Sequence, residues 1–280
     1  MAQHALTVLL TLILIGPAGL PAQQPAAPPR PVLTDAEVEQ FLQRARVVEA
    51  RELAKGITGS LRATLSDGTL THDAHIQMVD QRKEQFRAKG TVEFNFRDSW
   101  RFNVAAYRID RLLGLQLVPV SVPRTWNGRR GAFTWWIDDV MMEEGERLEK
   151  NLSAPDMSCW NAQTRLLRLL DQLIDNVDRN LGNMLITNTW RVWAIDHTRA
   201  FRFSKTPRNP ERLIAIDRIV LLRLEGLTFA TVKKAVERHI TDADIRNLLA
   251  RRDAIVEHFK ARGETSLYDR PDPAAGCLGQ

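Results

Sequence analysis

The stretch DNVDRNLGNMLITNTWRVWAIDHTRAF, residues 175–201, decides the fold of this chain. It follows an apolar helical run, and its two short apolar segments flank a Thr-Asn-Thr turn, which predicts a β-hairpin. Asp178 and Asn183 precede the hairpin and Asp196 ends its second strand, so these side chains are expected to converge at one end of it. Two carboxylates and an amide oxygen are ligands that Mg²⁺ or Mn²⁺ accepts while it also holds phosphate oxygens.

Each of these residues also suits an ordinary structural role. Asp178 or Asn180 could end the preceding helix, and Gly182 could supply a left-handed turn. Taken as an ordered set, they favour a functional interpretation. Asn183 and Asp196 are then the metal ligands, and Asp178 is the catalytic carboxylate that orients or deprotonates an acceptor hydroxyl.

The same residues resemble the catalytic centre of the HipA-like and phosphatidylinositol-kinase-like branch of the protein-kinase fold. In that branch a D-R-x-x-x-N run follows a helix, and a hairpin later delivers an Asp that binds metal. Asp178, Arg179, Asn183 and Asp196 match these positions. The resemblance covers residues 56–201 and implies an enzyme that uses ATP with Mg²⁺ or Mn²⁺.

A second segment, FNVAAYRIDRLLGLQLVPVSV at residues 102–122, is similar to a helix and strand of the secretory-pathway kinases that phosphorylate casein-like and matrix proteins. The matching positions are Ala105, Ala106, Tyr107, Asp110, Arg111, Leu113, Val118 and Pro119. The two segments together favour a two-lobed, kinase-like α+β fold.

The resemblance also implies a nucleotide site. GITGSLRATLSDG, residues 56–68, corresponds to a glycine-containing phosphate loop and its hairpin. Trp136 to Asp139 correspond to the hinge beside adenine, although tryptophans in such a strand are more often core residues. The residues expected to contact nucleotide are Gly56, Gly59, Ser60, Arg62, Gln77, Trp136 and Asp138.

Two positions depart from the family pattern. Gln77 stands where a kinase has a Lys that holds the α- and β-phosphates, and Asn103 stands where the following helix has its paired Glu. Glu93 or Asp98 could replace the carboxylate. Arginines that could replace the cation, each also a plausible surface residue, are Arg62, Arg101 and Arg199. These departures leave three alternatives: an active phosphotransferase, a pseudokinase that binds nucleotide or a protein partner without turnover, or an enzyme of a related transfer such as adenylylation.

Hydrophobic periodicity predicts a strand-rich first half and a helix-rich second half. Helices are expected over residues 34–55, 100–115 and 164–177, and two or three more between 211 and 262. Strands are expected between residues 56 and 80, over 117–123 and 131–141, and in the hairpin. We expect a kinase-like domain over 34–265, with lobes over about 34–140 and 141–265, and a flexible tail over 266–280.

The N-terminus carries the run ALTVLLTLILIGPAGL, which is typical of a signal peptide. It predicts cleavage after Ala22, a Pro/Ala-rich linker over residues 23–33 and an exported protein. The alternative is an uncleaved anchor, but the run is shorter than the roughly 20 residues of a spanning helix. Export permits a bridge between Cys159 and Cys277, although Cys277 lies in a Pro/Gly-rich tail and a structural disulfide is not expected.

Composition excludes few classes of protein. Of 280 residues, 44% are hydrophobic and 26% charged, as in a soluble globular protein. The net charge of +5 is spread along the chain, which suits an anionic ligand such as a nucleotide but lacks the basic stripe of nucleic-acid binders. The acceptor, a protein or a small molecule, cannot be inferred from this pattern.

Overall fold

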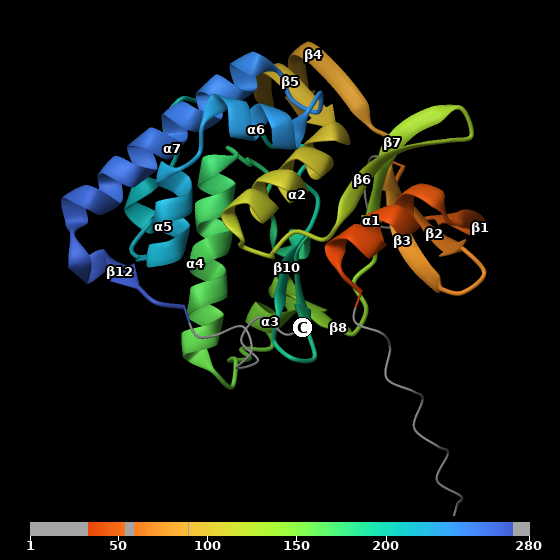
Figure 1. Cartoon of the computed structure of the whole chain (residues 1–280), viewed down its shortest axis with the longest axis horizontal. Coiled ribbons are helices and arrows are strands. Elements are labelled where there is room, and N and C mark those ends of the chain that lie inside the picture. The colour runs from red at the N-terminus through yellow and green to blue at the C-terminus, as the bar shows by residue number, and fades with distance from the viewer. Residues whose placement is uncertain (1–32, 54–58, 89, 271–280) are drawn as a thin grey trace, which may run out of the picture. The chain divides into compact units, whose positions relative to one another are not determined.

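The computed structural model describes residues 33–53, 59–88 and 90–270 (Figure 1). They belong to one unit that begins at Leu33. The predicted signal peptide, nearly all of the linker, Gly56 and Cys277 lie outside the described residues.

An antiparallel five-stranded sheet forms the first part of the fold, in the order β1-β2-β3-β7-β6 (Figure 1). Its strands are β1 Arg46–Glu52, β2 Leu61–Ser66, β3 Thr71–Gln77, β6 Ser121–Trp126 and β7 Arg129–Trp135. One face buries small and branched residues such as Ala63, Ala74 and Ile76, which pack in the same core as Phe41 and Leu42 of helix α1, Asp35–Arg44. The strands predicted between residues 56 and 80 correspond to β2 and β3, and those predicted over 117–123 and 131–141 overlap β6 and β7.

The helix predicted over residues 34–55 is wrong in its second half. A capping box between Thr34 and Glu37 starts α1, but Ala45 takes an extended conformation and β1 follows immediately. Most side chains of β1 are exposed, because its pairing with β2 is made by backbone groups at the edge of the sheet. An edge strand of this kind lacks the apolar alternation that identifies a strand in sequence.

A second hairpin, β4 Asp80–Ala88 and β5 Thr91–Ser99, leads into helix α2, Arg101–Leu113. The sequence does not predict this hairpin, since few of its residues outside the end of β5 are buried. The helix matches the prediction over 100–115 and ends at Gly114, whose φ of 61° lies in the left-handed region.

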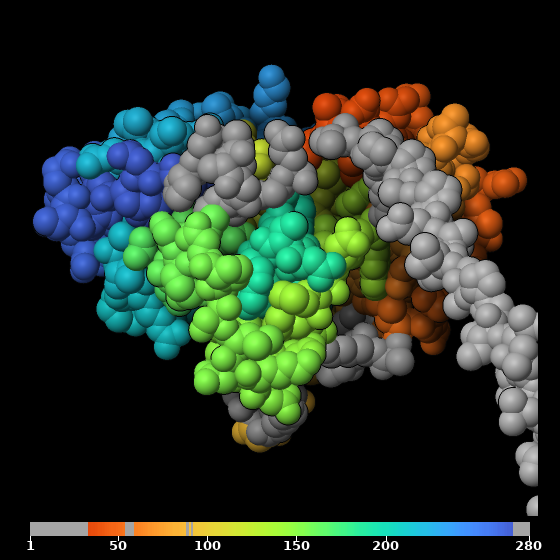
Figure 2. Space-filling model, turned by 90° about the horizontal axis from the view of Figure 1, so that it is seen from below, coloured from red at the N-terminus to blue at the C-terminus, as the bar shows by residue number. Residues whose placement is uncertain are grey.

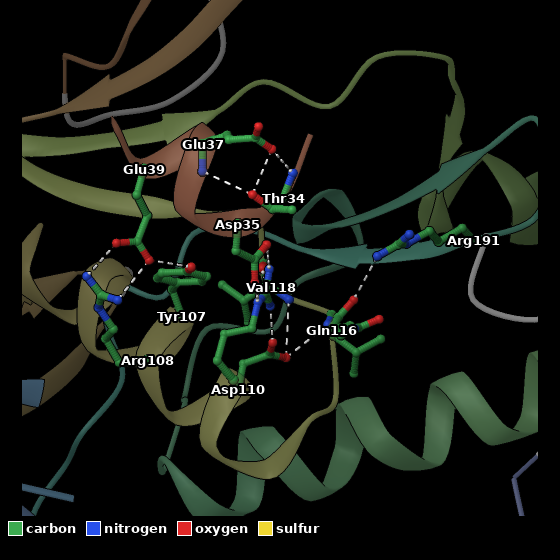
Figure 3. A network of polar contacts seen from close by, with 12 residues as sticks. Thr34, Asp35, Glu37, Glu39, Tyr107, Arg108, Asp110, Gln116, Val118 and Arg191 are labelled. Atoms are coloured by element: carbon green, nitrogen blue, oxygen red, sulfur yellow. Dashed lines mark hydrogen bonds and ion pairs between the residues drawn. The ribbon is translucent and has the colours of Figure 1, made fainter. Parts of the chain in front are cut away.

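Ion pairs and hydrogen bonds join α1 to α2 (Figure 3). Glu39 accepts from the Tyr107 hydroxyl at 2.7 Å and pairs with Arg108 at 2.8 Å, while Asp35 pairs with Arg111. Asp110 is fully buried, pairs with Arg111 and accepts from the backbone N–H groups of residues 117 and 118. Burial nevertheless raises the pKa of Asp110 to about 6.

The remaining chain is mainly helical around one small sheet, as predicted, and two of its helices, α5 and α6, pack against α2 (Figure 1). The three-stranded sheet has the order β10-β9-β8. Its strands are β8 Val140–Glu143, β9 Met184–Thr187 and β10 Val192–Ala194. The helices of this part are α3 Glu144–Glu149, α4 Met157–Leu173, α5 Arg218–Glu225, α6 Phe229–Val236 and α7 Asp242–Arg262. Single-turn 3₁₀ helices lie at Leu181–Asn183, Pro210–Arg212 and Glu264–Ser266.

Several predicted details need correction. Helix α4 ends at Leu173, so Val177, the last residue of the helix predicted over 164–177, lies beyond it and is 40% exposed. Part of the tail predicted over 266–280 is ordered, because β12, Leu267–Tyr268, pairs in parallel with β11, Ile216–Asp217. Cys159, in the first turn of α4, is disulfide-bonded, contrary to the expectation of no structural disulfide.

None of the described helices combines the length and the apolar character that crossing a membrane requires.

Candidate active site

Arg179 fixes the loop between α4 and the β9–β10 hairpin. Its guanidinium donates to the carbonyl oxygen of Asn183 at 2.6 Å and to that of Ile195 at 2.9 Å. It also forms an ion pair with Asp171 of α4 at 3.0 Å. Because Arg179 binds the backbone on both sides of the hairpin, the loop that carries Asp178 is held to the hairpin and to the helix.

The structure brings the three predicted catalytic and metal-binding residues to one end of the hairpin. The Asn183 side-chain amide donates to the carbonyl oxygen of Asp178 at 3.0 Å. The backbone N–H of Ile195, directly before Asp196, donates to the carbonyl oxygen of Asn183 at 3.1 Å. With its amide nitrogen engaged, Asn183 still has its Oδ1 oxygen for a ligand, because that atom accepts no hydrogen bond from the described residues.

Asp196 has an unusual backbone conformation for a residue with a side chain. Its φ of 51° lies in the left-handed region, which non-glycine residues adopt rarely and often at functional sites. The hydroxyl of Thr198 donates to Asp196 Oδ1 at 3.0 Å. This bond fixes the position of Oδ1 and thereby the orientation of the second carboxylate oxygen.

A third carboxylate, Asp98 at the end of β5, lies next to this group. The backbone N–H of Ser99 donates to the carbonyl oxygen of Thr198 at 3.0 Å and joins β5 to the segment after Asp196. Asp98 is 8% exposed, and its Oδ1 has no hydrogen-bond partner within the described residues. Burial raises the pKa of Asp98, and the charges of Asp196 and Asp178 act in the same direction.

The donor set fits a hard divalent cation that shares its coordination with phosphate. Among the described residues, no three His, Cys, Asp or Glu side chains are grouped closely enough to hold a metal ion by themselves. Mg²⁺ normally binds one or two carboxylates and completes its shell with water and substrate phosphates. Asp196, the Asn183 amide oxygen and the buried, unpartnered oxygen of Asp98 supply oxygen ligands of this kind.

The two residues that replace the expected Lys–Glu pair contact each other. The Asn103 side chain of α2 donates to Gln77 Oε1 of β3 at 2.6 Å, and both residues are buried. Asn103 Oδ1 accepts from the backbone N–H of His197 at 2.7 Å. A neutral amide pair therefore joins sheet and helix at this position and continues to the residue after Asp196.

His197 extends this chain of contacts to Arg179. The guanidinium donates to His197 Nε2 at 2.9 Å, so this nitrogen carries a lone pair and the ring is neutral. Burial and then the charge of Arg179 lower the pKa of His197 well below its usual value. The resulting path of hydrogen bonds runs through Gln77, Asn103, His197 and Arg179 to Asp171 of α4.

The residues expected to bind nucleotide are only partly brought together. Arg62 pairs with Asp73 at 2.6 Å, and its guanidinium lies 4.3 Å from the ring centroid of Trp136. Gly59 has a φ of 63° and open space where a Cβ would stand, whereas Ser60 is buried. Asp138 instead contacts His72 at 2.9 Å, and that ring stacks on Trp135.

The sequence interpretation does not include His75, which lies on the same face of β3 as Gln77. The charge of Asp196 acts on the His75 ring, although burial has the larger effect and lowers its pKa. Strand alternation, which places residues two apart on one face, is a signal that could have identified His75. Asp98, which the sequence suggests only as a substitute for the helix Glu, joins this group from β5 through a tertiary contact.

The hairpin lies beside α3 and α4. Side chains of these segments form adjoining patches on the face shown in Figure 2, where the hairpin is teal and the two helices are green. The predicted catalytic residues therefore come from a part of the chain that packs on the helical region, while Gln77 and Arg62 come from the five-stranded sheet.

Comparison with known proteins shows the fold. No family model and no curated protein sequence matches this chain. Among solved structures, Fam20 from hydra with sugar matches with a TM-score of 0.62 and 14% identity, over 84% of this chain and 92% of that one. The Golgi casein kinase with Mn/ADP bound matches with a TM-score of 0.59 and 13% identity, over 85% and 80% of the two chains. A second structure of the Golgi casein kinase gives 0.57 and 15%, over 85% and 79%.

Proposed function

With the two-lobed α+β fold of these kinases as the premise, we propose that the chain is an exported, metal-dependent, ATP-using phosphotransferase. The observation that carries the proposal is the contact of the Asn183 amide with the backbone of Asp178 at 3.0 Å, beside an Asp196 held in the left-handed region. That arrangement supports a carboxylate, an amide oxygen and a second carboxylate acting together.

Each residue has a defined part in the proposed reaction. Asn183 and Asp196 hold Mg²⁺ or Mn²⁺, which would neutralise the charge on the transferring phosphate. Asp178 orients the acceptor hydroxyl and takes its proton. Arg179 keeps Asp178 and Asn183 in register through its bonds to both flanks of the hairpin.

The nucleotide would lie against the polar face of the sheet. Arg62, Gln77 and Trp136 remain the proposed contacts from β2, β3 and the segment after β7, together with Gly56, Gly59 and Ser60 of the phosphate loop and Asp138 of the hinge. Arg62 stacked near Trp136 supplies a guanidinium on this face, and a guanidinium suits phosphate. The acceptor is a protein or a small molecule with a hydroxyl group.

Export is part of the proposal. The apolar run near the N-terminus supports it. The disulfide-bonded Cys159 agrees with an oxidising compartment, where such bonds persist.

A thermal-shift experiment tests the proposal. Mn²⁺ together with ATP should raise the melting temperature of the protein, because a ligand that binds only the folded state stabilises it. Asp196→Ala should remove the shift, whereas Asp253→Ala, which changes an exposed carboxylate on α7, should keep it. The absence of a shift with any pairing of nucleotide and metal would contradict the proposal.

The Gln77–Asn103 pair favours a second candidate, a pseudokinase that binds nucleotide or a protein partner without turnover. This pair provides hydrogen bonds but no positive charge for the α- and β-phosphates. Transfer of labelled γ-phosphate that disappears in Asp178→Ala would exclude the pseudokinase.

A further inference from the structure

Two adjoining hollows lie on the molecule outside the proposed active site. They share Arg101, Arg238 and His239 as lining residues, and their volumes are about 460 and 290 Å³. We call their union the basic basin. Its six cationic residues are Arg82, Arg97, Arg101, Arg130, Lys233 and Arg238, and its three acidic residues are Asp80, Glu237 and Asp244.

Two of the three acidic residues are already neutralised within the protein. Asp80 accepts from the Ser99 hydroxyl at 2.7 Å and pairs with Arg101 at 3.1 Å. Asp244 pairs with Arg97 at 2.9 Å and caps helix α7 through Thr241. These contacts leave the basin with an excess of positive charge.

Three of the six cations have no such compensation. Within the described part of the chain, Arg82, Arg130 and Arg238 form no ion pair. All three are exposed, and they come from the separate elements β4, β7 and the turn after α6. Charges on three elements around one depression suit a ligand that carries several negative groups.

Arg97 lines the second hollow and gives the basin a buried binding group. Only 4% of it is exposed, and its Nη1 pairs with Asp244. Its Nε and Nη2 have no hydrogen-bond partner among the described residues. The rings of Phe102 and Phe203 lie 5.1 and 4.5 Å from its guanidinium carbon and hold it in place. Buried donors without partners are rare, and an anionic oxygen would satisfy these two.

The N-terminus of α2 adds to the positive potential of the basin. Arg101, which lines both hollows, is the first residue of this 13-residue helix. The N-cap residue Trp100 provides no side-chain hydrogen bond, and the first turn has no acidic residue. The backbone N–H of Arg101 donates to the Ser99 hydroxyl at 3.3 Å, and the positive end of the helix dipole at this terminus attracts negative charge.

We propose that the basic basin binds an acidic peptide segment of the acceptor protein, an assignment of substrate class that rests on the proposed function. The two hollows together are larger than one oxyanion needs, and their cations are distributed along them. Ser99 lines the second hollow and directly follows Asp98, so an acceptor held in the basin is anchored beside the proposed active site. Several carboxylates on one extended segment match this distribution of charge.

Binding of a fluorescent ten-residue poly-glutamate peptide to the full chain, without nucleotide or metal, tests the basin. Arg130→Glu combined with Arg238→Glu should weaken binding by at least about tenfold, because two cations become two anions at the contact surface. The matched control is Arg129→Glu with Lys234→Glu, which changes the net charge equally on neighbouring exposed residues that line neither hollow. It should weaken binding by less than about threefold, as expected of charges at the edge of a contact.

Three outcomes would overturn the proposal. Equal weakening by the two double variants would mean that net charge alone controls binding. Full displacement of the peptide by millimolar inorganic phosphate would reduce the basin to a site for a simple anion. Tighter binding of a sulfated oligosaccharide or single-stranded DNA of the same charge would assign the basin to another class of partner.

The proposed function is tested separately in the same samples. Asp196→Ala should leave peptide binding unchanged, because the basin does not include it. If no variant or wild-type sample transfers phosphate while the basin variants still lose the peptide, the enzymatic proposal fails and the peptide site stands. Melting temperatures of both double variants close to that of the wild type show that they are folded.

Discussion

The proposed active site has two sides, the hairpin wall with Asn183 and Asp196 and the sheet wall with Gln77 and Arg62, and they use their polar residues differently. On the hairpin wall, Asn183 Oδ1 and one carboxylate oxygen of Asp196 accept no hydrogen bond from the described residues, and Arg179 donates to the backbone carbonyl oxygens of Asn183 and Ile195. On the sheet wall, Gln77 and Asn103 bind each other, and Arg62 binds Asp73. The hairpin wall is thus prepared for a cation, whereas the sheet wall is held together by its own contacts.

The difference shows that the two roles of a Lys–Glu pair can be carried by different residues. Such a pair both positions a helix and supplies charge to phosphates. The Gln77–Asn103 bond keeps the positioning and extends it to His197, without burying charges whose desolvation is costly. The charge has to come from elsewhere, and Arg62 is the cation on this face that lies close to Trp136.

The largest expected effect concerns the hairpin wall. Asp178→Asn should lower phosphate transfer by roughly 10²–10⁴, because general-base catalysis contributes about that much. It should leave the melting-temperature shift by Mn²⁺ and ATP in place, since Asp178 is not a proposed metal ligand. Transfer at the wild-type rate would remove Asp178 from the mechanism.

The next largest expected effect is on stability and concerns Arg179, which holds the hairpin wall in place. Arg179→Leu should destabilise the protein by about 3–5 kcal/mol, because it leaves Asp171 without its ion pair and removes the Arg179 donors from the Ile195 carbonyl oxygen and from His197 Nε2. Chemical denaturation measures the change. Arg168→Leu, an exposed arginine on α4, is the control and should alter stability by less than about 0.5 kcal/mol. Similar values for both variants would contradict the clamping role of Arg179.

A double-mutant cycle tests whether the sheet wall can be converted to the usual pair. Gln77→Lys and Asn103→Glu should each cost about 2–4 kcal/mol, since each buries an unpaired charge. The double variant should recover about 1–3 kcal/mol of the summed cost. It should also bind ATP more tightly than the wild type. Additive costs without recovery would mean that this wall cannot accommodate the ion pair.

The smallest expected effect is a pH dependence of stability, which comes from His197 in the path of hydrogen bonds that joins the two walls. The folded pKa of His197 is depressed, so its contribution to stability is present above the unfolded value near 6.5 and is lost as pH falls below it. The loss is at most about 1.4 kcal/mol per pH unit. The stability advantage of the wild type over His197→Asn should therefore shrink between pH 7.5 and 5. An advantage that grows on acidification would contradict a neutral, buried His197.

The sequence predicts the hairpin wall well because its information is local. Asp178, Asn183 and Asp196 lie within one short stretch, and hydrogen bonds within that stretch bring them together, one from the Asn183 side chain and one between backbone groups. Strands β1 and β4 are missed because their side chains are mostly exposed, and pairing through the backbone leaves no apolar pattern. The sequence suggests Asp98 only as a substitute for the helix Glu. Its place beside Asp196 depends on the contact of Ser99 with Thr198, which no spacing in the sequence encodes.

A crystal structure of the protein with Mn²⁺ and ADP tests the central claim most directly. We predict a metal ion bonded to Asp196 and to Asn183 Oδ1 at about 2.0–2.3 Å, with phosphate oxygens completing its coordination. Asp178 should lie beside the metal without binding it. Metal bound elsewhere, or ADP bound with Asn183 and Asp196 both free of metal, would contradict the account.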